Sequence, residues 1–116
     1  MAARQVVLRE AARGDLEQAT DWLLAEAGQG AALAFIDAAQ AAMRRIAERP
    51  GTGSARWSHE LDLPGLRSMR VKGHDWLVFY ITFDDRIDVW RVLHGARDIG
   101  GALHASGRSG TGSAEH

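Results

Sequence analysis

Apolar side chains recur with helical spacing over two neighbouring stretches of the chain. In Glu10–Ala27, Leu16, Ala19, Leu23 and Ala27 fall on one helical face, which predicts an amphipathic helix. The sequence Gly28-Gln29-Gly30 then interrupts the pattern, since glycine readily adopts positive φ. The same spacing returns from about residue 31 to residue 49 and stops before Pro50. Two such helices joined by a short glycine turn indicate an antiparallel helical hairpin.

Elsewhere the apolar positions have the spacing of strands. A first short strand is predicted over Arg4–Arg9, and Leu66–Lys72 alternates apolar with polar residues. Trp76–Phe83 is apolar on both faces, as in a central strand covered on both sides, and Ile87–His94 is the last strand.

The predicted order is β-α-α-β-β-β, which defines an α+β fold with the helical hairpin packed on a curved antiparallel sheet. Thr52–Pro64 is expected to be a polar connection, and the region from Gly95 to Leu103 to contain about one helical turn. We expect one domain over residues 1–104 and a flexible Gly/Ser-rich tail over residues 105–116.

The composition narrows the class of protein. The chain has 116 residues, no cysteine and a formal net charge of −1, so it lacks the strong positive charge of a general nucleic-acid coat. The histidines show no metal-ligand spacing, and we expect neither a metal nor a cofactor. Without a signal-peptide pattern or a long apolar stretch, the protein is expected to be soluble and cytoplasmic, with no membrane partner.

Several local strings resemble the RelE/ParE toxin superfamily of type II toxin–antitoxin systems. They are Ala11–Leu16 at the start of the first helix, Pro50 after the second, Pro64–Arg67, Val78–Tyr80 and, most specifically, Val92–Ile99 (VLHGARDI). The resemblance runs from about Val6 to Leu103. It implies a toxin that is neutralised by a cognate antitoxin similar to ParD, in a complex that binds its own promoter through the antitoxin.

The superfamily contains two activities. Members similar to RelE are ribosome-dependent mRNA endonucleases, whereas members similar to ParE inhibit DNA gyrase without an established catalytic set. RNA cleavage needs a group that takes a proton, cations at the scissile phosphate and an acid for the leaving oxygen. Here Trp76–Val78 carries no cation, residues 99–103 hold no tyrosine, and the only tyrosine, Tyr80, lies within the apolar strand. The sequence therefore favours the ParE branch, a binding inhibitor of gyrase rather than an enzyme.

Two alternatives stay open at this stage. One is an mRNA endoribonuclease with a rearranged site built from Arg67, His94 and Arg97. The other is a degenerate toxin that only pairs with its antitoxin and regulates a promoter.

The candidates for target binding are charged residues of the later strands and of the segment after them. They are Arg67, Arg70, Arg91, Arg97 and Asp98. Each has a structural alternative: Arg67 can bind a carboxylate or a helix end, Arg91 can form a buried ion pair, and His94 and Asp98 can stabilise a turn. Arg97 is expected to be exposed.

The antitoxin is expected to lay an amphipathic helix into an apolar groove between the helical hairpin and the sheet. The candidate contacts are Leu16, Trp22, Leu23 and Trp57. Trp22, Trp76 and Trp90 are more simply interpreted as packing residues, whereas Trp57 suits either a lid over the core or a protein interface.

Overall fold

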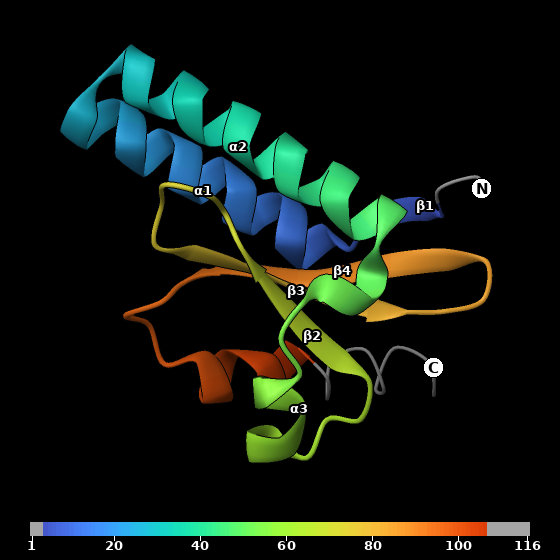
Figure 1. The fold of residues 1–116 in the computed structure, drawn as a ribbon. Coiled ribbons are helices and arrows are strands. Elements are labelled where there is room, and N and C mark those ends of the chain that lie inside the picture. The colour runs from blue at the N-terminus through green and yellow to red at the C-terminus, as the bar shows by residue number, and fades with distance from the viewer. Residues whose placement is uncertain (1–3, 107–116) are drawn as a thin grey trace.

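The computed structural model describes residues 4–106 and places a four-stranded sheet between two unequal helical layers (Figure 1). The elements follow in the order β1 (Gln5–Leu8), α1 (Glu10–Ala27), α2 (Gln29–Glu48), a 3₁₀ turn η1 (Pro50–Thr52), α3 (Arg56–Leu61), β2 (Leu66–Arg70), β3 (Trp76–Thr82) and β4 (Arg86–His94). The chain is helical again over residues 99–106. The long hairpin of α1 and α2 covers one face of the sheet, and α3 with the 99–106 helix covers the other (Figure 1).

The sheet order is β1-β4-β3-β2, with antiparallel pairing between β2, β3 and β4. The prediction of a wholly antiparallel sheet is wrong for one pair, because β1 runs parallel to β4. Parallel neighbours need a long connection between them. Here the helical hairpin and two further strands supply that connection, so the first and last strands of the sequence become adjacent.

Each face of the sheet has its own hydrophobic core. The larger core lies under α1 and α2 and includes Phe35, Ile46, Val78 and Tyr80. The smaller core includes Leu66, Phe79, Leu93 and Leu103 and lies under α3 and the 99–106 helix. β3 is buried from both sides, as its continuous apolar sequence predicts.

A β-bulge changes the register in the middle of β4. Phe79 lies opposite Arg91, but the next residue, Tyr80, lies opposite Val89, so Trp90 is the extra residue. Beyond the bulge, Val92 joins the larger core and Leu93 the smaller one. The bulge therefore sets the direction of every side chain in the last half of β4, including Arg91.

The connection between α2 and β2 differs from the predicted polar loop. It contains η1 and the short helix α3, on which Trp57 and Leu61 pack against the smaller core. Just before the helix, the Arg56 amide donates to the Ser54 hydroxyl, 3.2 Å away, in a local side-chain-to-backbone turn. A helix is favoured here because residues four positions apart, such as Trp57 and Leu61, lie on the same face of a helix and can both cover the sheet.

The C-terminal expectations are met only in part. The helix continues through residues 105 and 106, which were expected to belong to the flexible tail. Residues 107–116 of that predicted tail lie outside the described residues. No helix in the described part of the chain has the length and apolar content needed to cross a bilayer.

Candidate functional site

A buried ion pair joins α1 to β4. Both oxygens of Asp15 accept hydrogen bonds from Arg91, from Nε and Nη2, each at 2.7 Å. The same carboxylate accepts the Val92 amide at 2.9 Å. β1 pairs only with residues 86–89 of β4, so Asp15 supplies the acceptor that a longer first strand would have provided. Hydrogen bonding to Asp15 raises the pKa of Arg91 above its ordinary value.

Arg91 therefore forms the buried ion pair that the sequence suggests as the alternative to target binding. Its third contact, from Nη1 to the Ser106 hydroxyl at 3.0 Å, reaches the 99–106 helix. Arg91 is one of the candidates for target binding, but its side chain is held within the fold by α1 and by this helix.

The side chain of Tyr80 fixes the segment that follows α2. The phenol is fully buried, donates to the Pro50 carbonyl at 2.6 Å and accepts the Gly53 amide at 3.1 Å. Arg67, opposite Tyr80 in the sheet, donates to the carbonyls of Gly53 at 2.7 Å and Gly51 at 3.3 Å. Arg67 thus lies on the Met69 side of its strand, as the alternation predicts, and binds loop carbonyls instead of facing outward.

The tyrosine gives the protein a pH dependence that can be measured. Burial raises the pKa of Tyr80 above its ordinary value of 10.0, although the Gly53 hydrogen bond and the charge of Arg67 oppose the shift. Below about pH 10 both the folded and the unfolded phenol keep their proton, so this contribution to stability is fully present. Above about pH 10 only the unfolded phenol ionises, and stability falls by up to about 1.4 kcal/mol per pH unit until the folded-state pKa is reached.

Since Tyr80 is the only tyrosine, ultraviolet absorbance reports this group directly. Tyrosinate absorbance should lag behind that of the urea-unfolded chain as the pH is raised. The variant Tyr80→Phe removes the signal and serves as the baseline. A native titration that coincides with the unfolded one would show that the phenol is open to solvent.

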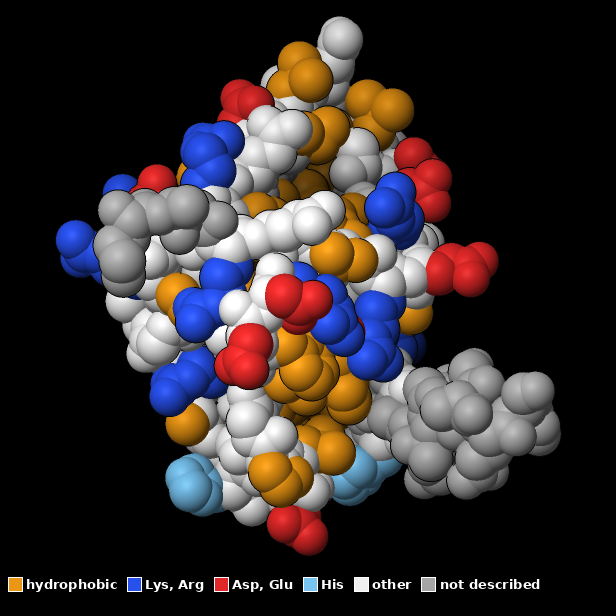
Figure 2. Space-filling model, turned by 90° about the vertical axis from the view of Figure 1, so that its right-hand side faces the viewer, with side chains coloured by type: hydrophobic (Ala, Val, Ile, Leu, Met, Phe, Trp, Pro, Cys, Tyr) orange, Lys and Arg blue, Asp and Glu red, His pale blue; other side chains and the backbone are white. Residues whose placement is uncertain are grey.

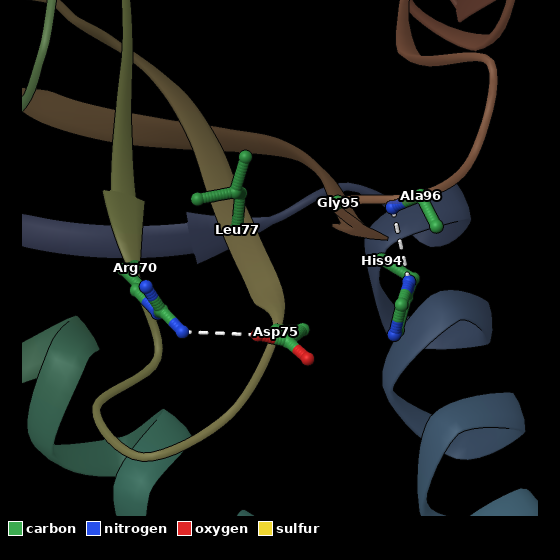
Figure 3. Close-up of a pocket in the computed structure, with 6 residues that line it drawn as sticks. All are labelled: Arg70, Asp75, Leu77, His94, Gly95 and Ala96. Carbon is green, nitrogen blue, oxygen red and sulfur yellow. Dashed lines mark hydrogen bonds and ion pairs between the residues drawn. The ribbon is translucent and has the colours of Figure 1, made fainter.

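Three strand ends surround a pocket of about 430 Å³ at the edge of the sheet (Figure 3). It is lined by Arg70 at the end of β2, Asp75 and Leu77 at the start of β3, and His94, Gly95 and Ala96 at the end of β4. Arg70 donates from Nη2 to Asp75 Oδ1 at 2.9 Å and from Nε to the His74 carbonyl at 3.0 Å. The guanidinium is thus held in one orientation at the pocket wall.

The segment after β4 has the turn contacts that its sequence suggested. Nδ1 of His94 accepts the Ala96 amide at 3.1 Å, and the imidazole ring meets Trp76 edge-on with a centroid distance of 4.7 Å. Asp98 Oδ1 accepts the Gly101 amide at 3.2 Å and caps the 99–106 helix. His94 and Asp98 thus each stabilise the backbone, with no hydrogen bond between them in the described part of the chain. Arg97 is exposed, as expected.

The three residues of the nuclease alternative are not brought together. Arg67 lies opposite Tyr80 and His94 opposite Trp76, four residues apart on β3, or about 13 Å along the strand. Arg67 also points to the helical-hairpin face, where its guanidinium binds loop carbonyls. Only His94 lines the pocket, together with Arg70.

A second, mostly apolar groove of about 240 Å³ lies between α1, α2 and the end of β1. Its lining includes Leu8, Leu16, Phe35, Ile36, Ala39 and Met43. Of the four antitoxin candidates, Leu16 is the one that lines this groove.

The other antitoxin candidates do not lie on the same surface. Leu23 is part of the core, with 8% of its surface exposed. Trp22 is 55% exposed and tilts against Trp76, so it is not the core residue that its spacing suggested. Trp57 lies on the opposite side of the sheet, where its ring packs edge-on against Phe79 as a lid. The four candidates therefore do not share one groove in the free protein, and their contact with an antitoxin stays a prediction.

The α3 side of the sheet is covered incompletely. Figure 2, which looks onto the turn between β3 and β4, shows apolar side chains (orange) at the surface below that turn, with basic side chains (blue) beside them. Partly buried residues of the smaller core, among them Leu61, Leu63 and Ile81, belong to this side. Within residues 4–106, no group of three or more His, Cys, Asp or Glu side chains is arranged to bind a metal ion.

Comparison with known proteins identifies the class. The family described as "ParE toxin of type II toxin-antitoxin system, parDE" matches residues 6–99, most of the chain. This protein therefore belongs to the ParE toxin family, and its membership implies an antitoxin partner.

The fold agrees with this assignment. A solved chain from the chromosomal ParDE TA system from P. aeruginosa superposes with a TM-score of 0.67 at 16% sequence identity. The match covers 79% of this chain and 96% of that chain. No curated protein sequence gives a significant match.

Proposed function

We propose that this ParE-family toxin inhibits DNA gyrase by binding to it, in the cytoplasm, and that a cognate antitoxin neutralises it. The observation that carries the proposal is the arrangement of the groups that RNA cleavage would need. Tyr80 is buried with both hydrogen-bonding functions of its phenol occupied, and Arg67 binds loop carbonyls far from His94. Within residues 4–106 these groups do not assemble a proton-transfer site, which favours action on the target through binding.

A gyrase supercoiling assay tests this proposal. Purified toxin, titrated into gyrase with relaxed plasmid and ATP, should suppress supercoiling or accumulate cleaved DNA. Preincubation with the antitoxin should restore activity. Gyrase that turns over normally at saturating toxin would refute the proposal.

A nuclease remains the second candidate, because His94 lines a pocket together with an arginine. Cleavage of mRNA on translating ribosomes that is lost in His94→Ala would favour it. A chain that neither slows growth nor affects either assay would instead fit a degenerate toxin, whose remaining role is promoter regulation with the antitoxin.

The antitoxin contact is proposed at the apolar groove between α1 and α2. An amphipathic helix binds such a groove through apolar side chains spaced three and four residues apart. Leu16 from α1 and Ile36 and Met43 from α2 give the groove apolar walls on both sides, and all three are only partly buried in the free toxin. Promoter binding by the complex is then a property of the antitoxin.

Met43→Glu places a charge in this groove and should weaken antitoxin binding at least about tenfold, as expected for a contact near the centre of an interface. Isothermal titration calorimetry measures the change, and circular dichroism shows whether the variant is folded. Leu33→Glu is the matched control, because Leu33 is on the same helix, is 53% exposed and does not line the groove. Equal affinities for Met43→Glu and the wild type would place the antitoxin elsewhere.

A further inference from the structure

The pocket at the strand ends contains Arg70, whose guanidinium is oriented by hydrogen bonds before any ligand binds. Two of the guanidinium nitrogens of Arg70 are engaged, Nε by the His74 carbonyl and Nη2 by Asp75. Within residues 4–106 its third nitrogen, Nη1, has no hydrogen-bond partner. An arginine already fixed in orientation loses less side-chain freedom when it binds a ligand than a mobile one does.

The rest of the pocket combines an apolar floor with a backbone wall. Leu77 is half-buried beneath it, and the Gly95-Ala96 turn forms the wall opposite Arg70 (Figure 3). The turn is held in place because the Gly95 amide donates to the Asp75 carbonyl at 2.7 Å. A pocket of about 430 Å³ of this kind suits a side chain that is apolar in its stem and carries one hydrogen-bond acceptor.

The local charge decides which kind of anion fits. Asp75 compensates the charge of Arg70 within the pocket. Lys72 and Arg97 are exposed cations close in sequence to the pocket residues, but neither lines the pocket. A nucleic-acid backbone is bound by several uncompensated cations in a row, which this pocket does not offer. One carboxylate, which can bind one guanidinium nitrogen at a time, matches it better.

We propose that this pocket receives an acidic side chain of the target protein, with the stem of that side chain or a neighbouring apolar residue resting on Leu77. The inference rests on the proposed function, since it names the part of the toxin that contacts the inhibited protein. It also separates the two binding activities: the target is bound at the strand ends of the sheet, and the antitoxin groove lies between α1, α2 and the end of β1.

Two variants test the pocket by different means. Arg70→Gln removes the cation, and because its ion pair with Asp75 is exposed, with side-chain exposures of 65% and 71%, the fold should tolerate the loss. Ala96→Trp fills the pocket from its wall without changing any charge. Arg45→Gln is the matched control, because it removes an exposed cation from α2 that does not line the pocket.

Both pocket variants should raise the toxin concentration needed for half-inhibition of gyrase at least about tenfold. Arg70→Gln should do so through the loss of one charge-assisted contact, and Ala96→Trp by excluding the target's side chain from the pocket. They should bind the antitoxin with unchanged affinity, and Arg45→Gln should behave as wild type in both assays. Inhibition by Arg70→Gln and Ala96→Trp at the wild-type concentration would overturn the pocket assignment. Binding of a labelled oligonucleotide that depends on Arg70 would overturn it in favour of a phosphate ligand.

Growth arrest on induced expression distinguishes failure of the pocket proposal from failure of the gyrase proposal. If the wild type arrests growth but leaves gyrase active, the gyrase proposal fails, and the pocket is judged by whether Arg70→Gln relieves the arrest while Arg45→Gln does not. A wild type that is harmless in both assays would overturn both proposals.

Discussion

Replacing Asp15 with alanine should lower the free energy of unfolding by about 3–5 kcal/mol, which is typical of removing one partner of a buried ion pair. The change leaves the guanidinium of Arg91 without its counter-ion and the Val92 amide without its acceptor. Domains of this kind are stable by only about 5–15 kcal/mol, so the variant should lose a large part of its stability. Urea denaturation followed by tryptophan fluorescence measures the loss.

The control is Asp21→Ala, which removes an exposed carboxylate from the same helix and should change stability by less than about 0.5 kcal/mol. A double-mutant cycle isolates the interaction between the two side chains. It is completed by two further variants, Arg91→Ala and Asp15→Ala/Arg91→Ala. A loss below about 1 kcal/mol for Asp15→Ala would mean that the pair is open to water.

Gly53→Ala is the second substitution with a large expected effect. A Cβ atom at this position would overlap the Tyr80 hydroxyl and lie 2.9 Å from the Ser68 carbonyl oxygen. Tyr80 is fully buried and cannot turn away. Overpacking of this kind costs about 1–3 kcal/mol, and losing the hydrogen bonds of the phenol adds about 1–3 kcal/mol.

The cause of this loss can be identified by a second change. Tyr80→Phe alone should destabilise the protein, because it leaves the Gly53 amide and the Pro50 carbonyl without a partner. In the double variant Gly53→Ala/Tyr80→Phe the overlapping hydroxyl is gone, so its loss of stability should be smaller than the sum of the single losses. Additive losses would show that the Ser68 carbonyl, and not the phenol, excludes the methyl group. Thermal denaturation of the four proteins decides between the two.

The regular elements follow from local patterns that the sequence contains in full. Apolar spacing predicts both long helices, and the alternation around Met69 predicts which side of β2 holds Arg67. The short helix α3 was missed because six residues hold too little apolar periodicity. The spacing of Trp57 and Leu61, four residues apart after Ser54, was the available signal for it.

The site could be predicted less well because its contacts join distant parts of the chain. Nothing near Asp15 in the sequence indicates that its partner is Arg91, and the two meet only because β1 ends early and exposes the edge of β4. The bulge at Trp90 reverses the alternation of side chains along β4. The side of the sheet to which Arg91 points can therefore be known only from the pairing register of β3 and β4. Trp22 shows the same limit: its spacing suggested packing, whereas its exposure depends on where the sheet ends beneath α1.

The position of β4 in the sheet has a consequence for synthesis. This strand leaves the ribosome after the other three strands of the sheet formed by residues 4–106, yet it lies between β1 and β3 and contributes to both cores. Until Arg91 has emerged, β1 has no complete partner strand and Asp15 has no counter-ion, so a nascent chain cannot acquire the finished structure step by step. We therefore expect interrupted translation to yield fragments that proteases remove, rather than partly active toxin.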